Sequence, residues 1–387
     1  MHEETRETDA FETDARLGRA LVALQEAQAG RGTGGHNTVV LSGREWAAAA
    51  GVATGEAWKL AEDLRRLGVE VEGEAATGWR LVGVADLALP EVLEPKIAGT
   101  IFAGGVRHFA KIGSTNAAAM RAGAEGVGKD GPLSVEQDQH PLQDHLPHPS
   151  KGSLDGAPAP LSQGAVWLAE EQTAGKGRAG HAWKSNPMDG IYCSALLRPK
   201  LAPAEVIILS LAAGLAVVEA VHEVTGLWGD LRWPNDVLMG GRKFCGILTE
   251  LNAEVTRVRY VVVGVGLNVN NTEFAPELAS IATSLRMETG QRFSRVELVA
   301  ALLRALDREQ AALSGVASNE KSGVGAARER ILRRFEERSS FCRGCTVTVE
   351  EDGGYEGVTR GLDERGFLRV ETPRGMRTVL SGGVRKR

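Results

Sequence analysis

The chain has 387 residues, more than one ordinary domain of roughly 100–200 residues contains, so we expect about two or three folding units. A hydrophobic fraction of 43% and a charged fraction of 25% are typical of a globular protein. The formal net charge of −5 excludes a protein whose main activity is to wrap nucleic acid or coat an anionic membrane, because both need clustered positive charge.

The cysteine content and the N-terminal sequence indicate the cellular compartment. Four cysteines are too few for a disulfide framework, which favours a reducing cytoplasm. Cys342 and Cys345 form an isolated C-x-x-C, and a closed zinc site needs a second ligand pair, so structural zinc is not favoured. The acidic N-terminus lacks an apolar signal segment, and no run of about 18 apolar residues occurs. The sequence predicts a cytoplasmic protein that does not span a membrane.

The first 85 residues read as a tail followed by a small helical unit. Residues 1–15 are predicted to be a disordered tail because their charge density leaves nothing to bury. Residues 16–85 show three helix patterns and then two short strands, the order of a winged helix-turn-helix. Ser42 and Thr54 stand at expected N-caps, and Gly51 and Gly68 at expected C′ positions.

Residues 86–338 contain the longest regular elements and form the predicted catalytic unit. A helix that opens at Pro203 and runs to Gly226 is apolar enough to be buried. Around it, strand patterns occur in AVWLAEE, GIYCSALL, LRWP, FCGILTEL and RYVVVGVGLNV, which predicts a mixed sheet and an α+β fold. Residues 126–164 are rich in Pro, Gly, Ser, His and Gln without a period, and are predicted to be a disordered insertion.

Residues 339–387 change to short strand patterns separated by DGG, DERG and TPRG turns. Closely spaced strands with turn residues between them predict a small β-barrel.

The most informative loop runs from Glu170 to Trp183 and follows a strand pattern. Three glycines alternate with Lys176 and Arg178, so backbone N–H groups and positive charges can close on a phosphate. The loop is not a P-loop, because the G-x-x-x-x-G-K-[ST] spacing is missing and no helix follows. A solvated turn is the alternative interpretation.

A second motif runs from Arg232 through Trp233-Pro234-Asn235-Asp236 to Lys243 and Ile247. A strand that ends in Trp-Pro cannot continue its ladder, so Asn235 and Asp236 are turned out at the strand end. A Gly-Gly turn then returns the chain through Lys243. Ordinary turn chemistry would also explain these residues, but a carboxylate, an aromatic ring and two cations close together suit a nucleotide and its metal.

Five segments, taken in order, resemble the bacterial biotin–protein ligases, including those with an N-terminal DNA-binding domain. The family has Ser-Thr-Asn at a helix start, a glycine/arginine-rich loop ending in Trp, and the segments Trp-Pro-Asn-Asp, Arg-Lys-x-x-Gly-Ile and Gly-x-Gly-x-Asn. Here they stand as Ser114 to Asn116, Gly175 to Trp183, Trp233 to Asp236, Arg242 to Ile247 and Gly264 to Asn268. The resemblance covers nearly the whole chain apart from the tail and the insertion.

The resemblance implies an architecture and an activity. It implies an N-terminal winged helix-turn-helix domain, a central mixed-sheet domain of the biotin/lipoate ligase type and a C-terminal SH3-like β-barrel. The implied activity is the ATP-dependent conversion of biotin to biotinyl-5′-AMP, followed by transfer of biotin to a lysine of a biotin carboxyl carrier protein. Mg²⁺ would offset the charge of the triphosphate.

Residue by residue, the resemblance implies a biotin site. Ser114, Thr115, Asn116 and Gln172 would hold the ureido ring, whose N–H and C=O groups need matched partners. Trp183 would pack on the ring and the valeryl chain. For Ser114 a helix N-cap is the alternative role, and for Trp183 core packing. The predicted biotin contacts also include Lys176, Gly177, Arg178, Lys243 and Gly246.

The implied chemistry begins when the biotin carboxylate attacks the α-phosphate of ATP, so positioning and charge neutralisation dominate. Lys243 and Arg178 are the predicted catalytic cations. Asp236 is a candidate base for the carrier lysine and a candidate magnesium ligand, although turn geometry explains it equally well. The predicted ATP contacts are Lys176, Arg178, Asn235, Lys243, Gly264, Gly266 and Asn268.

The chain departs from the family in the loop and just before Trp-Pro-Asn-Asp. The loop usually begins Gly-Arg-Gly-Arg and carries a further arginine, whereas this chain has Lys176, Ala179 and His181, and Arg232 replaces a lysine. Lysine cannot reproduce the two-pronged contact of a guanidinium, which puts tight retention of the adenylate in doubt. The reaction type is not affected.

Two alternatives stay open beside the ligase. A biotin-responsive transcriptional repressor, with or without ligase activity, would use the N-terminal unit. Its candidate recognition helix, residues 54–67, mixes acidic and basic residues, which is poor chemistry for phosphate binding. A lipoate or octanoate ligase shares the architecture but lacks the pair of Trp-Pro-Asn-Asp and Arg-Lys-x-x-Gly-Ile segments. A homodimer is expected by analogy with family members.

Overall fold

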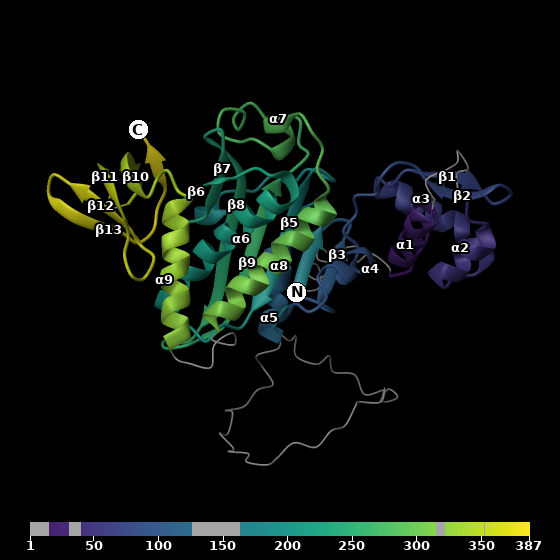
Figure 1. The fold of residues 1–387 in the computed structure, drawn as a ribbon, viewed down its shortest axis with the longest axis horizontal. Helices are drawn as coiled ribbons and strands as arrows, with labels where there is room; N and C mark the ends of the chain where they lie inside the picture. The colour runs from purple at the N-terminus through teal and green to yellow at the C-terminus, as the bar shows by residue number, and fades with distance from the viewer. Residues whose placement is uncertain (1–14, 31–39, 126–162, 315–321, 352) are drawn as a thin grey trace, which may run out of the picture.

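The computed structural model describes residues 15–30, 40–125, 163–314, 322–351 and 353–387. Apart from their outermost residues, the predicted tail 1–15 and the predicted insertion 126–164 lie outside the described residues. Figure 1 shows a central sheet flanked by helices, with an N-terminal helical unit and a C-terminal β unit at opposite ends. The chain is therefore α+β, as predicted.

The N-terminal unit has the predicted order of three helices and a two-stranded hairpin. Ser42 caps the second helix through a capping box with Glu45, and Gly51 ends that helix at φ 73°. Thr54 is not an N-cap as predicted; it begins a 3₁₀ turn, and Ala53 precedes that turn. The elements are α1 (Ala15–Ala29), α2 (Gly43–Ala50), η1 (Thr54–Glu56), α3 (Ala57–Arg66), β1 (Val71–Glu74) and β2 (Gly78–Leu81).

The central sheet has seven strands in the order β3-β4-β5-β9-β8-β7-β6. The β3–β4 pair is parallel and the other pairs are antiparallel, which confirms a mixed sheet. Each predicted strand pattern falls on one of these strands. They are β3 (Val106–Phe109), β4 (Val166–Ala169), β5 (Gly190–Leu197), β6 (Asp230–Arg232), β7 (Asp236–Met239), β8 (Arg242–Ala253) and β9 (Val258–Asn268).

Helices cover both faces of this sheet. The predicted helix from Pro203 begins as a 3₁₀ turn, η5 (Pro203–Glu205), and continues as α6 (Ile207–Thr225), which packs against α8 (Arg295–Leu313) and α9 (Ser322–Glu337) on one face. The other face packs against α5 (Thr115–Glu125). Among the described residues, Pro203–Thr225 is the single helix long and apolar enough to cross a membrane, but 72% of its apolar window is buried in the protein. That burial is typical of a core helix.

The C-terminal unit is a five-stranded antiparallel sheet in the order β13-β12-β11-β10-β14. It docks on the central unit where the indole Nε1 of Trp233 donates to the carbonyl of Gly366 at 2.9 Å. Cys342 and Cys345 are buried and unpaired, and the described residues contain no metal-binding group of His, Cys, Asp or Glu. The strands are β10 (Arg343–Val349), β11 (Tyr355–Leu362), β12 (Leu368–Thr372), β13 (Gly375–Val379) and β14 (Val384–Lys386).

A buried charge network ties the N-terminal segment to the central sheet. Arg295, at the start of α8, pairs with Asp86 at 3.2 Å and with Glu170 at 2.5 Å, and His108 lies 2.7 Å from Glu170. Burial alone would raise the pKa of Glu170, but Arg295 and His108 hold it below its ordinary value. The same Asp86 carboxylate accepts hydrogen bonds from the backbone N–H groups of Arg295 and Val296. Asp86 therefore caps α8 and neutralises its first residue.

Candidate functional site

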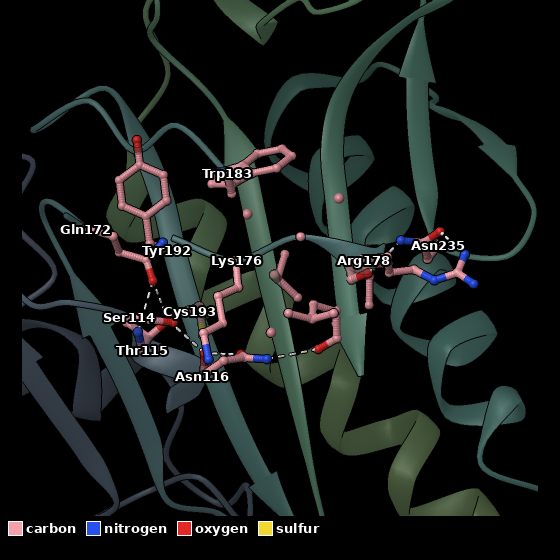
Figure 2. Close-up of a pocket in the computed structure, with 18 of the residues that line it drawn as sticks. Ser114, Thr115, Asn116, Gln172, Lys176, Arg178, Trp183, Tyr192, Cys193 and Asn235 are labelled. Carbon is pink, nitrogen blue, oxygen red and sulfur yellow. Dashed lines mark hydrogen bonds between the residues drawn. The ribbon is translucent and has the colours of Figure 1, made fainter. Parts of the chain in front are cut away.

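A pocket on the α5 face of the sheet gathers most of the predicted site residues (Figure 2). It lies over β5, β8 and β9 and holds about 440 Å³ of empty space. Its lining combines a polar end at the start of α5 with the cationic loop and with the Asn235 turn. The lining residues are Ser114, Thr115, Asn116, Gln172, Lys176, Gly177, Arg178, Trp183, Tyr192, Cys193, Ser194, Asn235, Lys243, Gly246, Ile247, Leu248, Gly264, Val265 and Gly266.

Three glycines make this pocket possible. A Cβ at Gly266 would lie 2.5 Å from the Trp183 ring, and one at Gly246 would lie 2.9 Å from both Trp183 and Lys243. A Cβ at Gly264 would lie 2.1 Å from Oδ1 of Asn116. The side chains of Asn116, Trp183 and Lys243 therefore approach the β8–β9 backbone so closely that only glycine fits at these three positions. The structure puts Gly264 and Gly266 beside Asn116 and Trp183, and their contact with the nucleotide stays a prediction.

The polar end of the pocket is a continuous chain of hydrogen bonds. The Gln172 Oε1 atom accepts from the Thr115 backbone N–H at 2.9 Å and lies 3.1 Å from the Thr115 hydroxyl. Ser194 Oγ lies 2.8 Å from Thr115 Oγ1 and 2.6 Å from Asn116 Oδ1. The chain ends where Asn116 Nδ2 donates to a Glu250 carboxylate oxygen at 2.8 Å. Thr115, Asn116 and Ser194 are buried, so this end of the pocket is rigid and polar.

Sequence reasoning missed Ser194 and Glu250. Ser194 had one visible signal, a hydroxyl within the apolar strand GIYCSALL. Ser114, which was predicted, also serves as the expected helix cap: its carbonyl accepts from the backbone N–H of Ala118 at 3.0 Å, and its hydroxyl lies 3.4 Å from the N–H of Ala117. Both of its predicted roles are compatible with this geometry.

The Gly-rich loop folds back on itself and returns Trp183 to the pocket. The Gly177 N–H donates to the His181 carbonyl at 2.7 Å, and the Trp183 N–H donates to the Gly175 carbonyl at 2.9 Å. Ala179, where the family has an arginine, adopts the left-handed region at φ 52°. The Lys176 side chain points across the pocket in Figure 2. The loop thus presents two cations, Lys176 and Arg178, and one indole to the same pocket.

At the opposite end of the pocket, one carboxylate holds two cations. Asp236 pairs with Lys243 at 2.6 Å and with Arg232 at 2.5 Å. Burial would raise the pKa of Asp236, but Lys243 and Arg232 hold it below its ordinary value. Arg178 donates to Asn235 Oδ1 at 3.0 Å, and burial lowers the pKa of Arg178 while Asp236 partly restores it. The turn at Asn235 and Asp236 therefore orients two predicted catalytic cations.

A second, wider hollow of about 1860 Å³ adjoins the first. Gly177, Arg178, Trp183, Asn235 and Lys243 line both. The far wall comes from the segment after β9 and from the C-terminal unit. It includes Asn268, Phe274, Leu278, Ile281, Ala282, Glu350, Ser381, Gly382, Gly383, Val384 and Arg385. Asn268 is buried and donates to the Thr283 carbonyl at 3.1 Å, which fixes that segment beside β9.

The surroundings of Asp236 do not fit a protein-held Mg²⁺. Both carboxylate oxygens already contact cationic nitrogens, and Asn235 Oδ1 accepts from Arg178. No group of three acidic, His or Cys ligands occurs among the described residues. This geometry does not support the prediction that Asp236 binds magnesium.

The chain was then compared with known proteins. Residues 158–268 match the biotin/lipoate A/B protein ligase family, and residues 343–387 match the biotin protein ligase C-terminal domain. These matches define a class: a ligase catalytic fold with a C-terminal β-rich domain.

Individual relatives narrow the class. The bifunctional ligase/repressor BirA of Bacillus subtilis is 28% identical over 351 residues, 89% of this chain and 93% of the relative. A biotin–[acetyl-CoA-carboxylase] ligase of Paracoccus denitrificans is 32% identical over 232 residues, 58% of this chain and 92% of the relative. A biotin protein ligase from Aquifex aeolicus in complex with biotin and ATP is similar in structure, with TM-score 0.50, 31% identity, and coverage of 59% of this chain and 91% of that chain. The chain belongs to the biotin protein ligase family.

Proposed function

We propose that this protein uses ATP to activate biotin as biotinyl-5′-AMP and then transfers biotin to a specific lysine of a biotin carboxyl carrier protein. The observation that carries the proposal is the junction of the two hollows. A narrow pocket with a polar end meets a wider groove at Lys243, Arg178 and Asn235. A ligand lying in the pocket with its ureido ring at Thr115 and Asn116 would bring its carboxylate to this junction.

In the first step, a biotin carboxylate oxygen forms a bond to the α-phosphorus of ATP, and the bond from that phosphorus to the diphosphate breaks. Two anions must approach, so the protein contributes cations and orientation. Lys243 is held at the junction by Asp236, and Arg178 is held by Asn235. Lys176 and Trp183 would close over the pocket from the loop. Mg²⁺ would arrive bound to the triphosphate oxygens of ATP.

In the second step, the neutral carrier amine attacks the acyl carbon, an amide forms, AMP leaves with the electron pair and the proton released from the amine passes to water. The amine must lose a proton, because a free lysine is protonated near neutral pH. Asp236 was the predicted base. Its low pKa and two ion pairs make it a poor proton acceptor, so we propose that Asp236 chiefly orients Lys243.

The decisive experiment incubates the purified protein with biotin, ATP, Mg²⁺ and a purified biotin carrier domain, and follows biotin on the carrier by mass spectrometry. We expect a single biotinylated lysine and release of AMP and diphosphate. Lipoate or octanoate supplied in place of biotin tests the alternative acyl substrates. Transfer of lipoate in preference to biotin, or binding of biotin with no transfer, would overturn the proposal.

A second candidate function is biotin-responsive repression, because the BirA relative aligns over 89% of the chain, which includes the N-terminal unit. We propose that this unit is a winged helix-turn-helix and that the C-terminal unit is an SH3-like barrel. The candidate recognition helix α3 offers little free charge: Arg66 pairs with Asp63 at 2.6 Å, and Arg65 donates to the Val71 carbonyl at 2.8 Å. Those contacts argue for weak binding to phosphates.

Retention on DNA tests this second function. We expect at most weak, salt-sensitive binding of the biotinyl-adenylate-loaded protein to random-sequence DNA fragments, measured by electrophoretic mobility shift at two salt concentrations. Selection of one tight DNA sequence from a random pool would establish the repressor. By analogy with the family, we also propose that the protein is cytoplasmic and forms a homodimer.

A further inference from the structure

Glu250 lies behind the polar end of the pocket, where it contacts the lining residue Asn116, and has no role in the proposed reaction. It stands on β8 two residues after Leu248, so both side chains are on the pocket face of the sheet. Across β9 and β5 its register neighbours are the apolar, buried Val262 and Leu196. A half-buried carboxylate beside an apolar row needs a hydrogen-bond partner, and its partner is the amide of Asn116 at 2.8 Å.

This contact fixes which way the Asn116 amide points. A carboxylate and a main-chain carbonyl can only accept, and Asn116 Nδ2 faces one of each: Glu250 at 2.8 Å and the Leu248 carbonyl at 3.2 Å. Oδ1 must then face Ser194 at 2.6 Å. The Ser194 proton is committed to Asn116, because an amide oxygen cannot donate.

The orientation passes along the hydrogen-bond chain. Ser194 has one hydroxyl proton for its contacts with Asn116 at 2.6 Å and Thr115 at 2.8 Å, so when that proton goes to Asn116 the Thr115 hydroxyl must donate to Ser194. The Thr115 proton is then withdrawn from the 3.1 Å contact with Gln172 Oε1, which keeps the Thr115 backbone N–H and a lone pair for a ligand. With a flipped Asn116 amide, the donor and acceptor of each hydrogen bond exchange roles: Ser194 donates to Thr115, and Thr115 donates to Gln172. Both directions satisfy the three internal groups, so the two acceptors beyond Asn116 decide between them: the Glu250 carboxylate at 2.8 Å and the Leu248 carbonyl at 3.2 Å, of which the charged and closer carboxylate is the stronger.

We propose that Glu250 is a positioning residue that sets the donor–acceptor direction of the Asn116–Ser194–Thr115 chain and so leaves acceptors for the ureido N–H groups of biotin. The inference rests on the proposed function, because it takes a cyclic urea as the ligand of this pocket. Glu250 does not touch the reacting atoms. Its effect is confined to recognition of the ring, and the chemistry at Lys243 lies at the other end of the pocket.

The test compares Glu250→Leu with Glu250→Gln and measures the Kd of biotin by isothermal titration calorimetry and the KM of ATP by diphosphate release. We expect Glu250→Leu to weaken biotin binding about tenfold, the usual size for a hydrogen bond to a charged group, with the KM of ATP unchanged. Glu250→Gln keeps an acceptor oxygen and should restore binding to within about threefold of wild type. The matched control is Glu254→Leu on the same hairpin, where the exposed carboxylate pairs with Arg259.

A double-mutant cycle separates an action through the chain from a local packing effect. In a Ser194→Ala background the chain is cut, so Glu250→Leu should then change the Kd of biotin by less than about twofold. The same tenfold loss in both backgrounds, or no loss in either, would overturn the role of Glu250. If Glu250→Leu does not fold, the comparison of Glu250→Lys with Glu250→Gln gives the same decision, because lysine can only donate and opposes the Asn116 amide orientation that Glu250 favours. Absence of carrier biotinylation by the wild type would instead defeat the proposed function.

Discussion

At the scale of single residues, the site depends on side chains that are held before a ligand arrives. Lys243 is one example: its ammonium lies 2.6 Å from Asp236 and 5.3 Å from the centre of the Trp183 ring. A cation placed in advance stabilises developing charge without reorganisation during the reaction. The place of Lys243 in the site could be predicted from the Arg-Lys-x-x-Gly-Ile segment, because that motif is contiguous in the sequence. Its partner within the turn, Asp236, was named for a different role.

Replacement of Lys243 tests this arrangement. We expect Lys243→Ala to lower the rate of biotinyl-adenylate formation by about 100-fold or more, the usual cost of removing one preorganised electrostatic group. The fold should persist, because Arg232 still pairs with the Asp236 carboxylate when the Lys243 ammonium is removed. Diphosphate release in the absence of carrier measures the first step alone. Lys200→Ala, at an exposed position away from the pocket, is the control; equal rates for the two variants would exclude Lys243 from the mechanism.

At the scale of the elements, strand patterns and the core helix were predictable, but contacts across strands were not. The chain Gln172–Thr115–Ser194–Asn116–Glu250 joins five positions that no sequence spacing relates. The glycines of β9 show the same limit. Their motif predicted a contact with the nucleotide, whereas the close approach of Asn116 and Trp183 follows from the register of β5, β9 and β8.

The glycines that line the pocket lead to a separate prediction. A Cβ at position 266 would meet the indole of Trp183 at 2.5 Å, so we expect Gly266→Ala to displace Trp183 and weaken biotin binding by about tenfold or more. The fold should persist, because Gly266 does not have a positive φ. Calorimetric titration with biotin and a thermal melt provide the readouts. Gly325→Ala in α9 is the matched control, since nothing lies within 4 Å of its added Cβ; similar affinities in both variants would mean that the hollow is not the biotin site.

At the scale of the whole molecule, the Arg295 network joins three segments far apart in the sequence. Removal of one partner leaves an uncompensated buried charge, so we expect Arg295→Met to lower the free energy of unfolding by about 3–5 kcal/mol. The lowered pKa of Glu170 also gives a pH dependence. Its contribution to stability is fully present above the ordinary glutamate value of about 4.3 and is lost as the pH falls through the lower folded value.

Urea unfolding between pH 3 and pH 7 measures both effects. The wild type should lose stability steeply at the acid end, and Glu170→Gln should be less stable at neutral pH but lose less on acidification. Glu364→Gln, at an exposed carboxylate in a turn of the C-terminal unit, serves as the control. A wild type and a Glu170→Gln variant with parallel pH profiles would show that this carboxylate does not carry the dependence.

The double use of Asp86 also determines where the chain can be divided. Its carboxylate belongs to the central unit, as the cap of α8 and the counter-ion of Arg295, although it lies in the segment that leads out of the N-terminal unit. An autonomous ligase fragment should therefore begin before this residue. A chain started at residue 84 keeps the carboxylate, whereas one started at residue 90 loses one of the two counter-ions of the buried Arg295 guanidinium and the acceptor of two backbone N–H groups at the start of α8. We expect the longer fragment to be expressed in folded form and the shorter one to aggregate, which gel filtration of the two would show. The practical boundary of the module is thus set by one side chain and not by the last strand of the hairpin.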